Sequence, residues 1–255
     1  AGEIEKRKKA ARLSEKALRL MAPGFFSIHP VEYEKPEEDI LLLDATFLST
    51  TPEATMFVPS YASWLEQTDQ SPAYAYLVKL LKYLQYQRPG KRWVLKSPHH
   101  MEFPDLAKKH FKDVHYIWTH RNIAESLPSF LSMVAHSQTI FSDQVSLDRV
   151  AKHWVRKTGY MLSKGIQFRK ENPKEKYTDV MYPQLIASPM SVLEDIYRFD
   201  ASIQENLLAR FKETEQQNKQ YKYGKHTYKL EDFGIRQENI NEVVNVYNEF
   251  LNTLK

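Results

Sequence analysis

The sequence predicts an α/β fold in which a parallel sheet is flanked by many helices. Of its 255 residues, 42% are apolar and 13% aromatic, enough to build a substantial core. Short β-prone runs alternate with longer helical patterns in the central part, an order typical of parallel βαβ units. We find no internal repeat and no linker-like segment. We therefore expect residues 1–255 to form a single domain.

The N-terminal third is expected to be helical. Apolar positions on a Lys/Arg/Glu background indicate an amphipathic helix over residues 3–21, which the pair at 23–24 ends. Acidic residues precede the apolar run 40–43, as a helix N-terminus favours. A short helix is expected over 59–66. A longer one begins near Ser71, where the following proline suits the first helical turn.

The central part changes character. Residues 92–96 form a short β-prone run, 99–110 a helical pattern, and 114–119 a second β-prone run. A helix over 123–136 follows. The alternation predicts a βαβ unit with short connections.

The C-terminal part continues this pattern with a helix over 147–171 and a last strand over 176–181. The remainder, 188–255, is expected to be helical, with a Tyr/Lys-rich loop at 221–229.

Composition excludes several classes of site. The chain has no cysteine, so it has no disulfide and no thiol nucleophile, and its histidines show no metal-binding spacing; we expect no metal site. A net charge of +4 is too small to indicate a nucleic-acid partner. We see neither a signal peptide nor a membrane span, and expect a soluble, cytoplasmic protein.

Two strand ends carry groups suited to an anion. Lys96 and Ser97 end one β-prone run just before His99 and His100, and Arg121 follows another. Ligands of open parallel sheets bind at the carboxyl ends of strands, where helix N-termini offer free N–H groups. These positions therefore indicate a site for a phosphate or sulfate group.

These residues belong to the run RWVLKSPHHMEFPDLAKKHFKDVHYIWTHRNIAESLPSF, and the chain also contains IHPVEYEKPEED, VPSYASWL and GKHTYKLEDFG. Taken in the order in which they occur along the chain, the four segments resemble the sulfotransferase superfamily, closest to its bacterial branch, over about residues 20–250. The resemblance implies a three-layer P-loop-like sulfotransferase fold. It also implies transfer of a sulfuryl group from 3′-phosphoadenosine-5′-phosphosulfate (PAPS) to a hydroxyl or amine of a small-molecule acceptor. The product would be adenosine 3′,5′-bisphosphate, and no metal is required.

The resemblance also implies roles for individual residues. Arg121 and Ser129 have the spacing of the pair that holds the donor's 3′-phosphate, and Ser126 lies on the same helix face three residues earlier. Lys225 and His226 lie in a loop where the family closes basic groups over the nucleotide. Helix-surface serines and a solvated lysine-rich loop are the alternatives.

For the transfer step, Lys96 resembles the lysine that steadies the transferred group, and His99 is the candidate base, with His100 as its substitute. The match is imperfect because a proline shifts the histidine by one place. One alternative is that these histidines pack against or cap a helix N-terminus. Another is that a carboxylate of the missing N-terminal segment or of the acidic loop serves as the base.

One feature of the family has no counterpart here. The seven glycines lack the spacing of the loop that wraps the donor's phosphosulfate, so we expect the N-terminal strand and loop to be missing from this chain. A truncated active enzyme is one interpretation. The alternative is a catalytically inactive sulfotransferase-fold protein that serves in binding or as a scaffold, and a kinase-like protein ranks last because no Walker-type loop is present.

Overall fold

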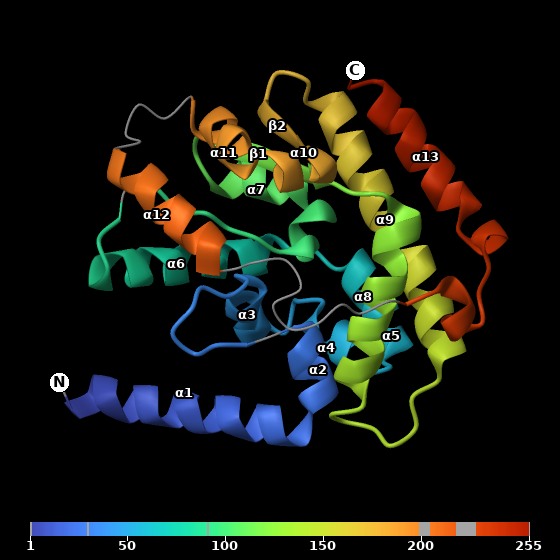
Figure 1. The fold of residues 1–255 in the computed structure, drawn as a ribbon, viewed down its shortest axis with the longest axis horizontal. Coiled ribbons are helices and arrows are strands. Elements are labelled where there is room, and N and C mark those ends of the chain that lie inside the picture. Colours follow the sequence, from blue (N-terminus) through green and yellow to red (C-terminus); the bar gives the residue numbers. More distant parts are fainter. Residues whose placement is uncertain (1, 30, 91, 199–204, 218–227, 255) are drawn as a thin grey trace.

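The computed structural model describes residues 2–29, 31–90, 92–198, 205–217 and 228–254. In these residues the sheet consists of β1 (His115–His120) and β2 (Lys176–Met181), which pair in parallel with His115 opposite Lys176 and His120 opposite Met181. Helices surround this small sheet (Figure 1). The predicted fold class is confirmed, and so are the strands expected at 114–119 and 176–181.

Two long helices connect the strands. Helix α8 (Ile123–Gln138) follows β1 directly, and the side chain of Asn122 caps it by accepting a hydrogen bond from the N–H of Ala124 at 2.9 Å. Helix α9 (Leu147–Glu171) leads to β2. Both helices contribute to the largest core cluster, which includes Leu127, Leu131, Val134, Val150, Ala151, Trp154, Phe233 and Ile240.

The C-terminal helix α13 (Asn241–Asn252) packs along α9 (Figure 1). Its buried Tyr247 and Phe250 form a second core with residues of α9 and β1. The helix α9 approaches the sheet closely at Gly165, where a Cβ atom would lie 3.2 Å from the indole of Trp118.

The N-terminal half is helical, as expected. Helices α3 (Ile40–Leu43) and α6 (Ser71–Gln87) share an apolar core, whereas α1 (Gly2–Met21) buries none of its residues and extends along the lower edge of Figure 1. The other elements are α2 (Pro23–Ile28), η1 (Asp44–Thr46), α4 (Thr51–Thr55), α5 (Pro59–Gln67), η2 (Pro98–Met101), α7 (Pro104–His110), α10 (Tyr182–Ala187), α11 (Pro189–Tyr197), α12 (Glu205–Gln217), η3 (Leu230–Phe233) and η4 (Gln237–Asn239).

Two local predictions were wrong. Residues 92–96 do not form a strand: the N–H of Lys96 donates to the carboxylate of Asp39 at 2.7 Å, and Val94 is 71% exposed. The helix expected over 99–110 is divided into η2 and α7, because Pro104 disfavours helical geometry at the residue before it. The assignment of residues 1–255 to one domain stays a prediction.

Candidate functional site

A cavity of about 430 Å³ lies where β1 passes into α8. Its volume falls in the range of about 300–1,000 Å³ that is typical of ligand pockets. Two distant parts of the chain form its walls: the start of α8 and the segment that leads to α13. The lining residues are Arg121, Ala124, Glu125, Pro128, Ser129, Tyr228, Lys229, Leu230, Glu231 and Gln237.

Arg121 and Ser129 both line this cavity, although eight positions separate them. Both residues are exposed. The guanidinium of Arg121 lies 4.4 Å from the ring centre of Tyr182, a cation–π contact that leaves its N–H groups available at the edge. It forms no ion pair with any residue that the structure describes. Together with the N-terminus of α8, these groups can bind an anion.

Of the other predicted cofactor-binding residues, the structure describes only Ser126. Ser126 is partly buried and is not among the residues that line the cavity. Lys225 and His226 lie outside the described residues. The sequence analysis therefore selected two residues that line one cavity, Arg121 and Ser129, and a third, Ser126, that does not line it.

The charges on the cavity wall balance. Arg121 and Lys229 supply two positive charges, and Glu125 and Glu231 supply two negative ones. Sequence reasoning missed both carboxylates. A bound phosphate would experience repulsion from both carboxylates.

A hydrogen-bond network lies under the end of β1. The hydroxyl oxygen of Tyr247 lies 2.7 Å from Nδ1 of His120, the last residue of β1. Nε2 of His120 lies 2.8 Å from Asp179, which also accepts two hydrogen bonds from Arg169 at 2.5 and 2.6 Å. Burial lowers the pKa of His120, outweighing the effect of Asp179, and burial raises the pKa of Tyr247 to about 12. Both groups are therefore neutral near pH 7.

Lys96 and His100 are not among the residues that line the Arg121 cavity, and they contact the neighbouring residues Glu38 and Asp39. The ammonium of Lys96 pairs with Glu38, and the ring of His100 is held between Asp39 and the hydroxyl of Tyr74, each at 2.7 Å. Burial alone would raise the pKa of Asp39, but the hydrogen bond and charge of His100 outweigh it and lower that pKa. Both ring nitrogens of His100 are thus engaged.

His99 is completely buried, and neither of its ring nitrogens has a hydrogen-bond partner in the described part of the chain. Its ring packs against Phe103, with the ring centres 4.9 Å apart. Burial lowers the pKa of His99 to about 3, so the ring is neutral. The role of His99 as catalytic base stays a prediction, and this position does not support it because an acceptor cannot reach the ring.

The sequence analysis did not predict a buried ionic cluster around Lys157. The ammonium of Lys157 on α9 lies 2.9 Å from Glu102, 3.1 Å from Glu66 and 3.4 Å from Glu53. A signal was present in the sequence, because Lys157 follows Trp154 by three positions on the apolar face of its helix. A lysine at such a position requires buried carboxylate partners.

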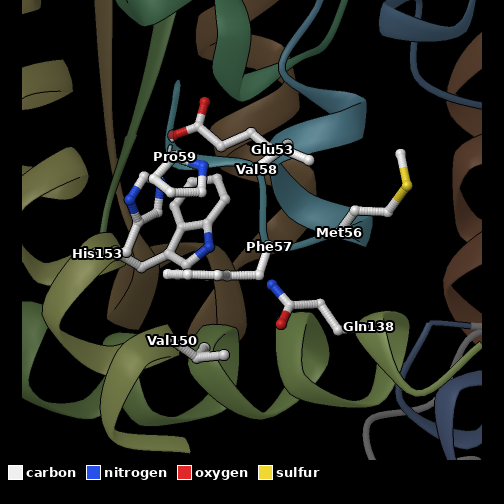
Figure 2. Close-up of a pocket in the computed structure, with 9 residues that line it drawn as sticks. Glu53, Met56, Phe57, Val58, Pro59, Gln138, Val150 and His153 are labelled. Atoms are coloured by element: carbon white, nitrogen blue, oxygen red, sulfur yellow. Dashed lines mark hydrogen bonds and ion pairs between the residues drawn. The ribbon is translucent and has the colours of Figure 1, made fainter. Parts of the chain in front are cut away.

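A second, narrow cleft adjoins this cluster (Figure 2). Glu53 and His153 meet on its wall, with Oε1 of Glu53 and Nε2 of His153 2.7 Å apart. The other side chains that line the cleft, Phe57 among them, are mostly apolar. The cleft has no room for a water molecule.

Neither metal sites nor membrane spans are found in the parts of the chain that the structure describes. No group of three acidic or histidine side chains is placed to hold a metal ion there. No helix in those parts is both long and apolar enough to cross a bilayer.

Comparison with known proteins gives an independent result. The model of the sulfotransferase family matches residues 2–200. The structure is similar to the crystal structure of sulfotransferase STF1 from Mycobacterium tuberculosis, with 28% sequence identity and a TM-score of 0.73 over 85% of this chain and 56% of that one. Sulfotransferase STF9 from Mycobacterium avium is similar in fold, with 22% identity and a TM-score of 0.77 over 84% of this chain and 55% of that one.

The chain thus spans slightly more than half the length of each of these two solved proteins. Among curated proteins no match is found. Since the family model covers most of the sequence, the chain belongs to the sulfotransferase family.

Proposed function

We propose that this protein binds PAPS and transfers its sulfuryl group to a hydroxyl or amine of a small-molecule acceptor. One observation carries the proposal: Arg121 and Ser129 line a single cavity at the end of β1. Family membership supports the same chemistry. The activity remains a proposal because the chain spans about half the length of its solved relatives.

In this proposal the cavity holds the 3′-phosphate half of the nucleotide. The guanidinium of Arg121 offers a planar fork of N–H donors that matches two phosphate oxygens. The hydroxyl of Ser129 donates a further hydrogen bond from the next turns of α8. The positive end of the α8 dipole adds to the attraction. Lys225 and His226 are proposed to close over the nucleotide.

The transfer step is an in-line displacement. A bond forms between the acceptor oxygen or nitrogen and sulfur, the bond from sulfur to the bridging phosphate oxygen breaks, and a base removes the acceptor proton. Lys96 is proposed to offset the charge on the leaving phosphate. Of the two candidate bases, His100 has a carboxylate partner, Asp39, whereas His99 has none. To take the acceptor proton, Nδ1 of His100 has to exchange its hydrogen bond with the hydroxyl of Tyr74 for one with the acceptor.

Calorimetric titration with adenosine 3′,5′-bisphosphate tests the nucleotide half of the proposal. We expect saturable binding by the chain, and a loss of at least 30-fold in affinity for Arg121→Ala, since a charged hydrogen-bond pair contributes about 2–3 kcal/mol. Arg149→Ala, an exposed arginine outside the cavity, is the matched control. Folded protein without measurable binding would contradict the proposal. Transfer of a labelled sulfuryl group to phenol or amine acceptors then distinguishes an enzyme from an inactive binding protein.

A further inference from the structure

We infer that Tyr247, on the C-terminal helix, is a positioning residue that fixes the end of β1 so that Arg121 faces the nucleotide. The inference rests on the proposed function and adds a residue to it. The hydroxyl of Tyr247 lies 2.7 Å from Nδ1 of His120, the residue directly before Arg121, and Asp179 holds the other ring nitrogen of His120 at 2.8 Å.

The direction of each hydrogen bond in this chain follows from the partner at its far end. Asp179 is an ionised carboxylate held by Arg169, so it can only accept, and Nε2 of neutral His120 donates to it. Nδ1 of His120 then carries a lone pair and accepts from the O–H of Tyr247.

Burial makes this arrangement rigid. His120 is 2% exposed and Tyr247 is 3% exposed, so water does not compete for their polar atoms. The ring centre of His120 also lies 5.4 Å from that of Trp118, in a stacked arrangement within β1. A hydrogen bond in such surroundings restricts His120, and with it the end of β1 next to Arg121, more than an exposed one would.

The same part of the chain builds the opposite wall of the cavity. Tyr228, Leu230 and Gln237 line it just before α13 begins, and α13 then carries Tyr247 to the end of β1. The C-terminal segment therefore both covers the cavity and orients the arginine inside it. Arg121 is the first residue after β1, so the backbone geometry that Tyr247 fixes decides where its side chain points.

Removal of one hydroxyl oxygen tests this role. In calorimetric titrations with adenosine 3′,5′-bisphosphate we expect Tyr247→Phe to raise Kd about tenfold, because small misplacements of a binding group cost up to about 100-fold. Tyr116→Phe is the matched control: Tyr116 lies on β1, and its hydroxyl donates to the carbonyl of Pro104 at 3.0 Å. We expect its Kd to stay within twofold of the original, with both variants titrated well below their unfolding temperatures.

A second measurement separates positioning from a merely structural role. If Tyr247 acts through Arg121, then Tyr247→Phe changes Kd less than twofold when Arg121 is already replaced by Lys, although it weakens the original protein tenfold. Additive losses, unchanged binding by Tyr247→Phe, or an equal loss in Tyr116→Phe would each overturn the inference. If Tyr247→Phe does not fold, Asp179→Asn takes its place, since Asp179 is the other end of the hydrogen-bond network through His120.

The outcomes also separate the inference from the proposed function. Binding that depends on Arg121 but not on Tyr247 overturns the inference alone. Absence of binding in the unmodified, folded protein overturns both.

Discussion

The ammonium group of Lys157 lies 2.9 Å from a carboxylate oxygen of Glu102, and both side chains are completely excluded from solvent. Glu53 and Glu66 lie on other sides of the same ammonium. The four residues come from α9, from the turn after η2, and from α4 and α5. The cluster therefore joins the N-terminal helices to the segment that follows Lys96.

Replacement of Lys157 by methionine should destabilise the fold strongly. The variant keeps the volume of the side chain but leaves three carboxylates without their shared cation. Breaking a buried ion pair in this way costs about 3–5 kcal/mol. Urea denaturation measures the difference in unfolding free energy. Lys152→Ala, on the exposed face of α9, removes only a surface pair with Asp148 and should cost less than about 1 kcal/mol. Equal effects of the two substitutions would contradict the role of the cluster.

The same cluster predicts an unusual pH dependence. Burial raises the pKa of Glu102 from 4.5 to about 7, despite the opposing charge of Lys157. Between pH 4.5 and pH 7 the carboxyl of Glu102 is protonated in the native state but ionised in the unfolded state. The stability that this proton contributes is therefore complete below pH 4.5 and is lost as the pH rises through 7. At 1.36 kcal/mol per pH unit, the whole contribution is about 3 kcal/mol.

Glu102→Gln removes this titration. The unfolding free energy of the original protein minus that of the variant should therefore fall by about 2–3 kcal/mol between pH 5 and pH 8. Parallel urea titrations at several pH values give the difference, with the exposed Glu249→Gln as control. A difference that stays constant over this range would show that Glu102 has an ordinary pKa.

Periodicity predicted most of the fold. The helices at 123–136 and 147–171 and the strands at 114–119 and 176–181 were found within a few residues, because their apolar patterns are long or their β-branched and aromatic content is high. The run 92–96 has the same local signal. A strand also requires a neighbour, and local composition cannot supply that information: Asp39 occupies the N–H of Lys96 instead.

The candidate site was predictable only in part. Arg121 and Ser129 were predicted because their spacing resembles that of the sulfotransferase pair that holds the donor's 3′-phosphate, and both line the cavity. Glu125 shares a face of α8 with Ser129 and was missed, whereas Glu231 and the hydroxyl of Tyr247 approach from positions whose proximity depends on tertiary packing. The burial of His99 likewise follows from its packing against Phe103 and Tyr74, and nothing in its local sequence indicates it.

Glu125 should oppose phosphate binding. It lines the cavity four residues before Ser129, on the same face of α8, and repels a ligand that carries several negative charges. Glu125→Gln should therefore tighten binding of adenosine 3′,5′-bisphosphate by about two- to fivefold at low salt, and the gain should shrink as salt screens the charge. Titrations at two ionic strengths measure both effects. Weaker binding by the variant would instead assign Glu125 an attractive contact with the nucleotide.

The two serines of α8 provide a matched test of the cavity itself. Ser129 lines it and is exposed, whereas Ser126 is partly buried and is absent from its wall. Ser129→Ala removes a donor to a charged phosphate, a bond that contributes about 1.5–3 kcal/mol, and should raise Kd for adenosine 3′,5′-bisphosphate roughly 10- to 100-fold. Ser126→Ala makes the same chemical change one turn earlier, with the same gain in helix propensity, and should alter Kd less than twofold. A larger loss for Ser126→Ala would place the phosphate on the other side of α8, and Arg121 would then have to leave the ring of Tyr182 to reach it.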